Sequence, residues 1–386
     1  MVIEHVHDEG PGTVEQDVVA DLAPVVFASL PRADQRAKAE RYVRSLLAAD
    51  GRKTLRSVAA QFGGLSARQS VHHFISGSSW EWSSVRHALA RRAAELFGAY
   101  AWVVRPLFIP KSGSHSIGVE HQWVPPLGKT STGQLAFGLW LVGESANVPV
   151  NWRIFLPERW LEDAERRTRS SIPARIAPAS WEDCARSLLR GFDRQGTQRP
   201  LVLDAPGLDP EVCAEGFAGV GAPLLIRVSP TLKLPVNTAI LPGYSARELP
   251  AGQLIHSLKE LWRRTSTSET EAGRSSRGIA AVVPVLLGRR PMRLVAEWQE
   301  DERQPDRLWL TDSTEATVGL LVRAARQADV VEADFRRVSE RVGVRDFAGR
   351  SFQGWHRHIT LASVAHLAAV LSEAPARLSG GTGPQR

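Results

Sequence analysis

The first hundred residues carry two different patterns of apolar and polar positions. From Ala33 to about Phe97 apolar residues recur every three or four positions, which places them on one face of a helix. The series is Tyr42, Leu46, Leu47, Leu55, Val58, Phe62, Val71, Phe74, Ile75, Val85, Leu89 and Leu96. It predicts a helical domain of about four helices over residues 32–99. Residues 1–31, with six acids and the run Gly10–Gly12, show little periodicity and are predicted to form a flexible acidic arm.

After Tyr100 the apolar residues fall in short runs rich in Val, Ile, Leu and Trp that are broken by Gly and Pro, a pattern typical of strands. We expect three consecutive strands at 108–109, 117–119 and 135–142, a helix at 181–193, and two buried strands at 200–204 and 224–228. Alternating strands and helices predict an α/β sheet with helical crossovers over residues 100–230.

The next segment, residues 231–312, is predicted to be a β-rich insertion. It contains a polar loop at 263–277 followed by strand patterns at 279–285, 292–298 and 308–310. Two helices, at 314–342 and 355–372, return the chain to the core over residues 313–375. Residues 376–386 are predicted to be a disordered tail.

Several motifs occur in a fixed order between residues 35 and 370: Lys111–Val119, Leu127–Lys129 with Gln134, Trp152–Trp160, Val331–Phe335 and Gly354–Thr360. In sequence and spacing they resemble the bacterial insertion-sequence transposases of the DDE superfamily. The resemblance implies an RNase H-like core, an N-terminal helical DNA-binding domain and a mostly β insertion between the last two catalytic acids. It also implies double-stranded DNA as the partner and a homodimer.

These enzymes cut DNA with three carboxylates that converge on two magnesium or manganese ions. The resemblance assigns the second acid to Asp204, at the end of the strand 200–204, and the third to Glu332. The family's first acid falls on Arg105-Pro106-Leu107, and an arginine there would repel the metal ions. Magnesium or manganese is therefore expected only if the protein is active, with Asp204 and Glu332 as ligands and Glu120 or Glu144 in place of the missing acid. From local sequence alone, Asp204 is almost as well explained as a helix cap, and Glu332 as a solvated residue.

Charge supports a polyanionic partner. The chain has a formal net charge of +7, and its first 31 residues contain six acids but no Lys or Arg, so the remainder carries +13. Such an excess favours nucleic acid, although a basic surface that serves only solubility has about equal weight. The two cysteines lack the spacing of a zinc site or a disulfide framework. No apolar stretch is long enough for a membrane span, and we expect a cytoplasmic, nucleoid-associated protein.

Cations at predicted helix starts are the candidate DNA contacts, because helix N-termini favour phosphate. One such start is Gly51–Arg56 and another is Ser66–His73, together resembling a helix-turn-helix unit. The run Trp355–His358 offers an aromatic ring and three cationic groups, or alternatively a helix start packed in the core. The full set of candidates is Arg52, Lys53, Arg56, Lys111, His115, Lys129, His356, Arg357 and His358.

Three hypotheses follow from the sequence. The first is a transposase-like DNA-binding protein that has lost strand cleavage and acts as a regulator or accessory factor. The second is an active transposase that cuts DNA with two divalent metal ions at a rebuilt site. The third is a repurposed scaffold whose former cleft binds a protein or a small molecule.

Overall fold

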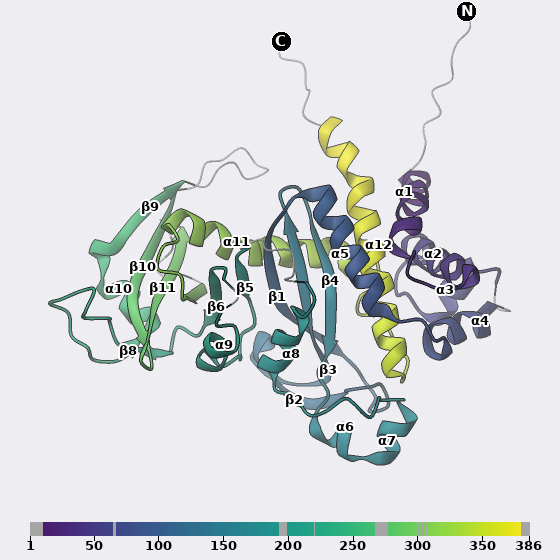
Figure 1. Ribbon diagram of the computed structural model, residues 1–386, viewed down its shortest axis with the longest axis horizontal. Coiled ribbons are helices and arrows are strands. Elements are labelled where there is room, and N and C mark those ends of the chain that lie inside the picture. Colours follow the sequence, from purple (N-terminus) through teal and green to yellow (C-terminus); the bar gives the residue numbers. More distant parts are fainter. Residues whose placement is uncertain are drawn as a thin grey trace, which may run out of the picture.

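The protein is built around one large mixed sheet with helices on both faces (Figure 1). The computed structural model describes residues 11–64, 67–192, 199–219, 221–266, 277–299, 302, 305 and 307–379. Its central strands are β1 (Ala99–Pro110), β3 (Lys129–Gly143), β4 (Asn147–Ile154), β5 (Leu201–Leu203) and β6 (Leu224–Val228). The antiparallel meander β1-β3-β4 continues into β5 and β6, which run parallel to β1 and to each other. This is the strand arrangement of an RNase H-like fold, as the sequence predicted.

The predicted insertion contributes strands to the same sheet instead of forming a separate one. Its elements are β7 (Lys233–Leu234), β8 (Leu249–Pro250), α10 (Ala251–Ser257), β9 (Trp262–Ser266), β10 (Arg277–Leu287), β11 (Arg290–Gln299) and β12 (Arg307–Thr311). Strand β12 pairs with β6, and the order then runs β12-β11-β10-β9 to the edge. Among the strands of the described residues, β7 and β8 form a separate two-stranded sheet.

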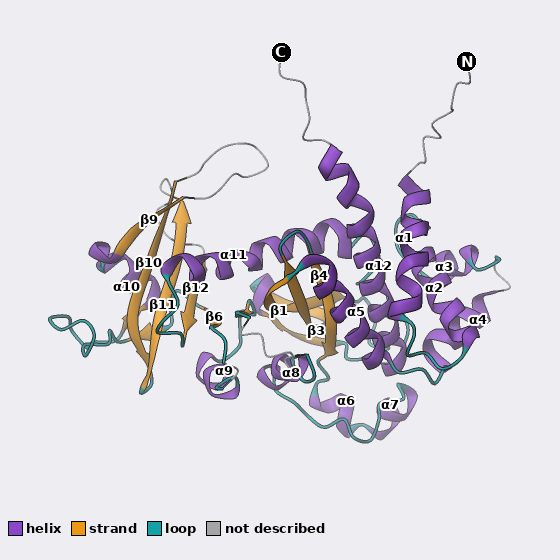
Figure 2. Cartoon of the chain, turned by 45° about the horizontal axis from the view of Figure 1, so that its top comes forward, coloured by secondary structure: helices purple, strands orange, loops and turns teal. Residues whose placement is uncertain are grey.

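Two helices on opposite faces define the layers (Figure 2). Helix α11 (Val318–Asp334) lies against β1, β5, β10 and β11 through small and branched residues at helical spacing: Leu321, Ala324, Ala325, Ala328 and Val331. On the other face, α5 (Trp82–Phe97) packs on β3 and β4, and α12 (Phe352–Ser379) lies along β4 and contacts α5 and the N-terminal helices. It is buried on all sides from Gly354 to Val370 and forms the centre of the larger hydrophobic core.

The N-terminal helices share that core. They are α1 (Pro11–Val26), α2 (Ala33–Ala48), α3 (Leu55–Gln61), α4 (Arg68–His72) and the π-helical turn η2 (His73–Gly77). Apolar residues from Val19 in α1 to Val370 in α12 form one continuous cluster. The helical segment 32–99 therefore packs as part of the molecule's main core, and α5 lies directly on the sheet.

The expected flexible arm over residues 1–31 was wrong for its described part. Residues 11–26 form α1, which buries Val19, Leu22, Val26 and, beyond the helix end, Leu30. These apolar positions have helical spacing, and acidic residues lie between them. Residues 1–10 lie outside the described part of the chain.

Other expectations about single elements also need correction. Ile117–Val119 is a turn and not a strand, because Gly118 has a φ of +70° and a Cβ there would approach the Phe155 carbonyl oxygen to 3.0 Å. The next strand is β2 (Glu120–Val124), and β4 was not predicted. The loop expected from Arg263 begins later, since β9 extends to Ser266; residues 267–276 are outside the described residues.

The ends of the last two helices differ from the prediction as well. The helix expected over 314–342 is α11 followed by the π-helical turn η5 (Phe335–Ser339). Helix α12 continues through Ser379, so the first four positions of the predicted tail are helical, and residues 380–386 lie outside the description.

Four short helices follow β4 along the chain: α6 (Glu158–Glu162), α7 (Ala164–Arg169), α8 (Trp181–Leu188) and α9 (Pro210–Gly216). Helix α8 contacts β3 and β4, and α9 contacts β6. Helix α8 starts with a capping box between Ser180 and Asp183, and α9 starts at Asp209, whose carboxylate accepts from the Glu211 and Val212 amides. Among the described residues, no helix is both long enough and apolar enough to cross a membrane.

Candidate functional site

The predicted acids Asp204 and Glu332 lie on either side of Arg105. Strand β1 runs parallel to β5, and the Asp204 amide donates to the Val104 carbonyl at 3.0 Å, so Asp204 lies beside Arg105 at the end of the strand pair. Helix α11 brings Glu332 over the same point, since its alanines let the helix approach the sheet closely. The structure thus brings together Arg105, Asp204 and Glu332, which the sequence resemblance assigned to the three catalytic positions.

Arg105 forms ion pairs with both acids. Its Nε lies 3.0 Å from Asp204 Oδ2, and a terminal nitrogen lies 3.1 Å from Glu332 Oε2. Asp204 is almost completely buried, at 1% exposure, whereas the side chains of Arg105 and Glu332 are partly exposed. The guanidinium therefore occupies the space between the two carboxylates.

Three more arginines complete the cluster. Arg227 on β6 donates to Asp204 Oδ1 at 2.8 Å, and Arg307 on β12 donates to Glu332 Oε2 at 3.3 Å while also pairing with Asp329 at 2.7 Å. Arg336, one helical turn after Glu332, donates to its Oε1. Every oxygen of Asp204 and Glu332 therefore has a guanidinium next to it. Arg336 lies four residues after Glu332 on the same predicted helix, whereas Arg227 and Arg307 had no signal in the sequence, because they come from strands of other segments.

The cluster does not fit a pair of divalent metal ions. Magnesium and manganese need carboxylate oxygens that are free to bind them, and the nearby positive charges oppose their approach. Among the described residues, no group of three or more His, Cys, Asp or Glu side chains converges in a way that could hold a metal ion. The local alternative for Asp204, a helix cap, is also not what the structure shows, since Asp209 caps α9.

The two acids considered as replacements lie elsewhere. Glu120 starts β2 and pairs with Arg159. Glu144 lies in the exposed turn after β3, next to Gly98, which precedes β1. Neither contacts Asp204 or Glu332 in the structure.

A cleft of about 390 Å³ opens beside the cluster. Its charged lining residues are Arg105, Glu332, Arg336, Glu340 and Arg345, and its aromatic ones include Trp140 and Trp152. The cleft is thus lined by both cations and aromatic rings, and Arg105 forms part of its wall.

The candidate DNA contacts divide into exposed and internal residues. Arg52, Arg56, His115 and Lys129 are exposed. Lys111 is half-buried, where burial lowers its pKa to about 8, and its ammonium donates to the Phe347 carbonyl at 2.7 Å. Lys53 is buried, and its backbone amide donates to Asp346. The segments around Arg52 and Lys111 therefore converge on the loop at 346–347.

The run Trp355–His358 is internal. Arg357 donates to the carbonyls of Trp80 and Ile75 and lies 5.5 Å from the Trp80 ring centroid. His358 is hydrogen-bonded to the Tyr42 hydroxyl and to the Gly343 carbonyl, and burial lowers its pKa to about 4. Trp355 and His356 are buried as well. In this structure these side chains position α12 in the core and do not reach the surface.

Comparisons with known proteins agree with the geometry. Residues 25–249, more than half of the chain, match the family model described as DDE superfamily endonuclease. Over 245 residues the chain is 24% identical to a probable transposase for insertion sequence element IS701 from Microchaete diplosiphon; this covers 61% of the chain and 56% of that relative. The region matched by the family model includes Arg105 and Asp204 but ends before Glu332, whose assignment rests on the motif Val331–Phe335. The chain belongs to the DDE superfamily of endonucleases.

Proposed function

We propose that this protein binds double-stranded DNA with a transposase-like scaffold but does not cut it, and that it acts as a regulator or accessory factor. The observation that carries the proposal is Arg105, which pairs with Asp204 and Glu332 where the family has its first acid. The positive charge that metal ions supply to this family is here supplied by guanidinium groups. These can neutralise the acids, but they cannot activate a water or a 3′-hydroxyl as a metal ion does.

The balance of charge in the cluster supports this reading. Asp204, Asp329 and Glu332 carry three negative charges, and Arg105, Arg227, Arg307 and Arg336 carry four positive ones. A divalent ion would have to displace arginines that form ion pairs with the acids and then remain close to their charges. Removing partners from a buried ion pair is costly, which makes this exchange unfavourable.

A nicking assay tests the loss of cleavage. Purified protein is incubated with supercoiled DNA in magnesium or manganese, beside Asp204→Ala and Glu332→Ala. We expect no metal-dependent nicking by the unmodified protein. Nicking that disappears in both variants would overturn the proposal and establish an active transposase with a rebuilt site.

Metal binding gives a second readout on the same site. The variant Arg105→Asp places a carboxylate at the position that the resemblance assigns to the first acid. The melting temperatures of Arg105→Asp and Arg105→Met are compared with and without manganese. The proposal expects no manganese-dependent stabilisation of the unmodified protein or of Arg105→Met. Saturable stabilisation of the unmodified protein would contradict it, whereas stabilisation of Arg105→Asp alone would identify the arginine as the change that abolished the metal site.

DNA binding rests on the exposed cations and on the family. Arg52 precedes α3, and Arg56 is the second residue of this helix. The N-cap residue of α3 is Thr54, whose hydroxyl accepts from the Ser57 amide, so both arginines lie near the helix N-terminus. Each phosphate contact contributes about 0.9 to the slope of log affinity against log salt. The double variant Arg52→Gln/Arg56→Gln should lower this slope by about 2 in a titration with duplex DNA. An unchanged slope would remove these residues from the interface.

Assembly and location follow the family in this proposal: a homodimer in the cytoplasm, at the nucleoid. Sedimentation of the purified protein distinguishes a dimer from a monomer. If duplex DNA does not bind even at low salt, the cleft of about 390 Å³ with its aromatic and cationic lining favours the remaining alternative, a scaffold that binds a small molecule or a protein.

A further inference from the structure

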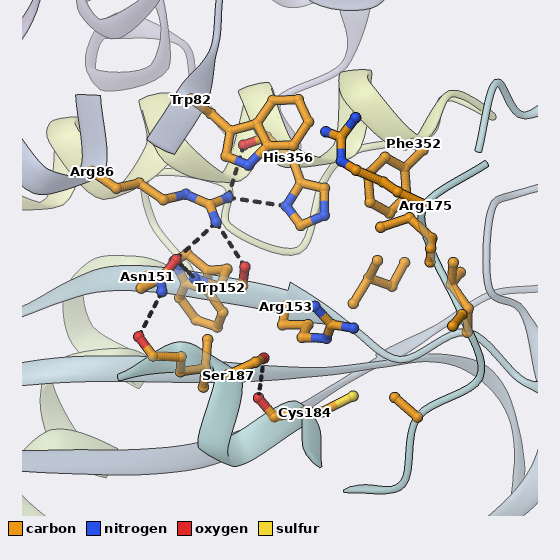
Figure 3. A pocket seen from close by; sticks show the side chains of 16 residues that line it. Trp82, Arg86, Asn151, Trp152, Arg153, Arg175, Cys184, Ser187, Phe352 and His356 are labelled. Carbon is orange, nitrogen blue, oxygen red and sulfur yellow. Dashed lines mark hydrogen bonds between the residues drawn. The ribbon is translucent and has the colours of Figure 1, made fainter. Parts of the chain in front are cut away.

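A second cavity lies between β4, α5 and α8 (Figure 3), whereas Asp204 and Glu332 lie on the face of the sheet that α11 covers. It has a volume of about 190 Å³ and is formed by β4, α5, α8, α12 and the segment around Arg175. None of the residues that line it is Asp or Glu, whereas three are arginines: Arg86, Arg153 and Arg175. The cavity therefore concentrates positive charge without a carboxylate in its wall.

Arg86 is a buried cation held only by neutral acceptors. Its Nε donates to the Thr360 hydroxyl at 2.7 Å, and its terminal nitrogens donate to Asn151 Oδ1, the Trp152 carbonyl and the His356 carbonyl at 2.7–3.1 Å. Burial lowers its pKa to about 9, so it is charged at neutral pH. Its hydrogen bonds are satisfied, but no carboxylate of the described residues neutralises its charge.

His356 presents a proton to the cavity. Arg86 donates to its Nδ1 at 3.2 Å, so this nitrogen is the acceptor and Nε2 carries the hydrogen. The ring is only 5% exposed and is stacked on Trp82 at 4.7 Å. Nε2 faces the cavity in Figure 3. A ring N–H directed into the cavity can donate a hydrogen bond to an acceptor bound there.

Arg153 and Arg175 add further donors. Neither forms an ion pair with a carboxylate among the described residues, and the buried Nε of Arg153 donates to no protein atom there. Arg153 instead lies against the thiol of Cys184, whose pKa is raised by burial, so this neighbour is neutral. Arg175 is exposed and extends over the cavity in Figure 3.

We propose that this cavity binds a phosphate group, with Arg153, Arg175 and His356 Nε2 as hydrogen-bond donors and Arg86 as a fixed charge. Guanidinium groups match phosphate oxygens in geometry and charge. The volume is below the roughly 300–1,000 Å³ of pockets that enclose drug-sized ligands, so the occupant is compact. It is either free inorganic phosphate or a terminal phosphate that projects into the cavity from a DNA strand.

Calorimetric titration of the full chain with sodium phosphate, at ionic strength matched with sodium chloride, tests the site. Arg153→Gln/Arg175→Gln is compared with Arg289→Gln, which removes an exposed arginine in the β10–β11 turn far from the cavity. We expect saturable binding that is at least about tenfold weaker in the double variant and unchanged in Arg289→Gln, since a charge-assisted hydrogen bond contributes about 1.5–3 kcal/mol. Arg175→Gln alone, at an exposed position, provides a variant that keeps the fold.

Two results would overturn the site: no saturable binding by the unmodified protein, or equal binding in all variants. Competition then distinguishes the sources. Displacement of phosphate by a 5′-phosphorylated oligonucleotide, but not by its 5′-hydroxyl counterpart, assigns the cavity to DNA ends. Failure of both to compete assigns it to the free ion. The outcome is independent of the nicking assay, since the two sites lie on opposite faces of the sheet.

Discussion

Two groups of arginines lie on opposite faces of one sheet and differ in what neutralises them. On the α11 face, Arg105 and its three neighbours surround Asp204 and Glu332, and each carboxylate oxygen has a guanidinium partner. On the α12 face, Arg86, Arg153 and Arg175 have neutral partners or none among the described residues. The same residue type therefore completes one site and leaves the other needing an anion.

The difference shows how position decides the role of an arginine. Arg105 follows Val104, which pairs with Leu203, the residue before Asp204. The guanidinium of Arg105 therefore lies next to a buried carboxylate. Arg153 lies on β4 opposite Phe137, which belongs to the larger, apolar core. A charge placed there can be balanced only by a ligand or by solvent. We therefore propose that the first arrangement disfavours metal ions and that the second favours anions.

Lowering the pH should have the largest effect on the free energy of unfolding, and it should act through two buried histidines of α12. His358 and His366 are buried, and burial lowers the pKa of each to about 4 from an ordinary value of 6.5. Between these values the unfolded chain binds protons that the folded protein does not, so stability is complete above pH 6.5 and falls as the pH drops towards 4. The loss is about 3 kcal/mol for each histidine.

Urea denaturation at several pH values measures this loss, with His358→Gln and His366→Gln as comparison variants. Each variant should be less stable at pH 7 but show a weaker decline towards pH 4. If neither substitution changes the slope, the acid sensitivity belongs to the carboxylates of the α11 face, and the contrast between the faces would be reversed.

Removal of the Arg86 guanidinium should lower the free energy of unfolding by about 4 kcal/mol. Arg86→Met removes a donor from the Thr360 hydroxyl, Asn151 Oδ1 and the Trp152 and His356 carbonyls. Asn151 Oδ1 keeps the Trp152 amide and the His356 carbonyl keeps the Thr360 hydroxyl, so the loss comes mainly from the other groups, at about 1–3 kcal/mol for each buried group left unsatisfied. The exposed Arg91→Met on the same helix is the matched control and should change stability by less than about 0.5 kcal/mol. Equal effects of the two variants in denaturant titrations would show that the buried cation is dispensable.

Arg105→Met should cost less, about 2 kcal/mol. The buried Asp204 loses one of its two arginines but keeps Arg227, and Glu332 keeps Arg307 and Arg336. Adding Asp204→Asn to Arg105→Met should recover part of the loss, because the uncompensated charge is then removed. If Arg105→Met is more stable than the unmodified protein, the ion pairs do not repay their desolvation, and the cluster was retained for another reason.

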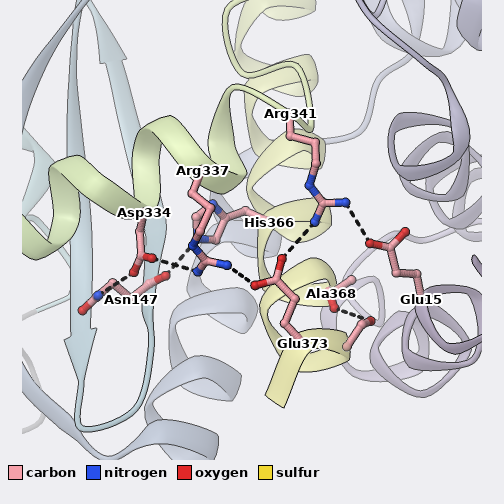
Figure 4. Close-up of polar contacts among 9 residues, drawn as sticks. Glu15, Asn147, Asp334, Arg337, Arg341, His366, Ala368 and Glu373 are labelled. Atoms are coloured by element: carbon pink, nitrogen blue, oxygen red, sulfur yellow. Dashed lines mark hydrogen bonds and ion pairs between the residues drawn. The ribbon is translucent and has the colours of Figure 1, made fainter. Parts of the chain in front are cut away.

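The smallest effect is expected at the surface network of Figure 4. Glu373 pairs with Arg337 and Arg341, and Arg341 also pairs with Glu15 of α1 at 3.0 Å. Because these side chains are partly exposed, Glu373→Gln should cost about 0.5 kcal/mol, and less in high salt. A loss above about 2 kcal/mol in salt-matched denaturation would mean that this network, and not the apolar face of α1, holds the N-terminal helix.

Much of the fold could be predicted from local patterns. The helical spacing before Phe97, the alternating runs after Tyr100 and the strands at 279–310 describe how single segments bury their apolar residues, which sequence encodes directly. The prediction missed α1, where acids outweighed a helical spacing that was present, and β4, whose apolar and polar residues alternate less clearly beside Pro149 and Arg153.

The sequence by itself determined the family and most of the elements, and it predicted the absence of the first acid, because each is a property of local runs and their spacing. It did not determine the state of the site. Only the tertiary structure placed Arg105, Arg227 and Arg307 around Asp204 and Glu332, and turned His356 and Arg357 inward. Burial and ion pairing depend on contacts between segments that are far apart in the sequence, and local sequence patterns do not predict those contacts.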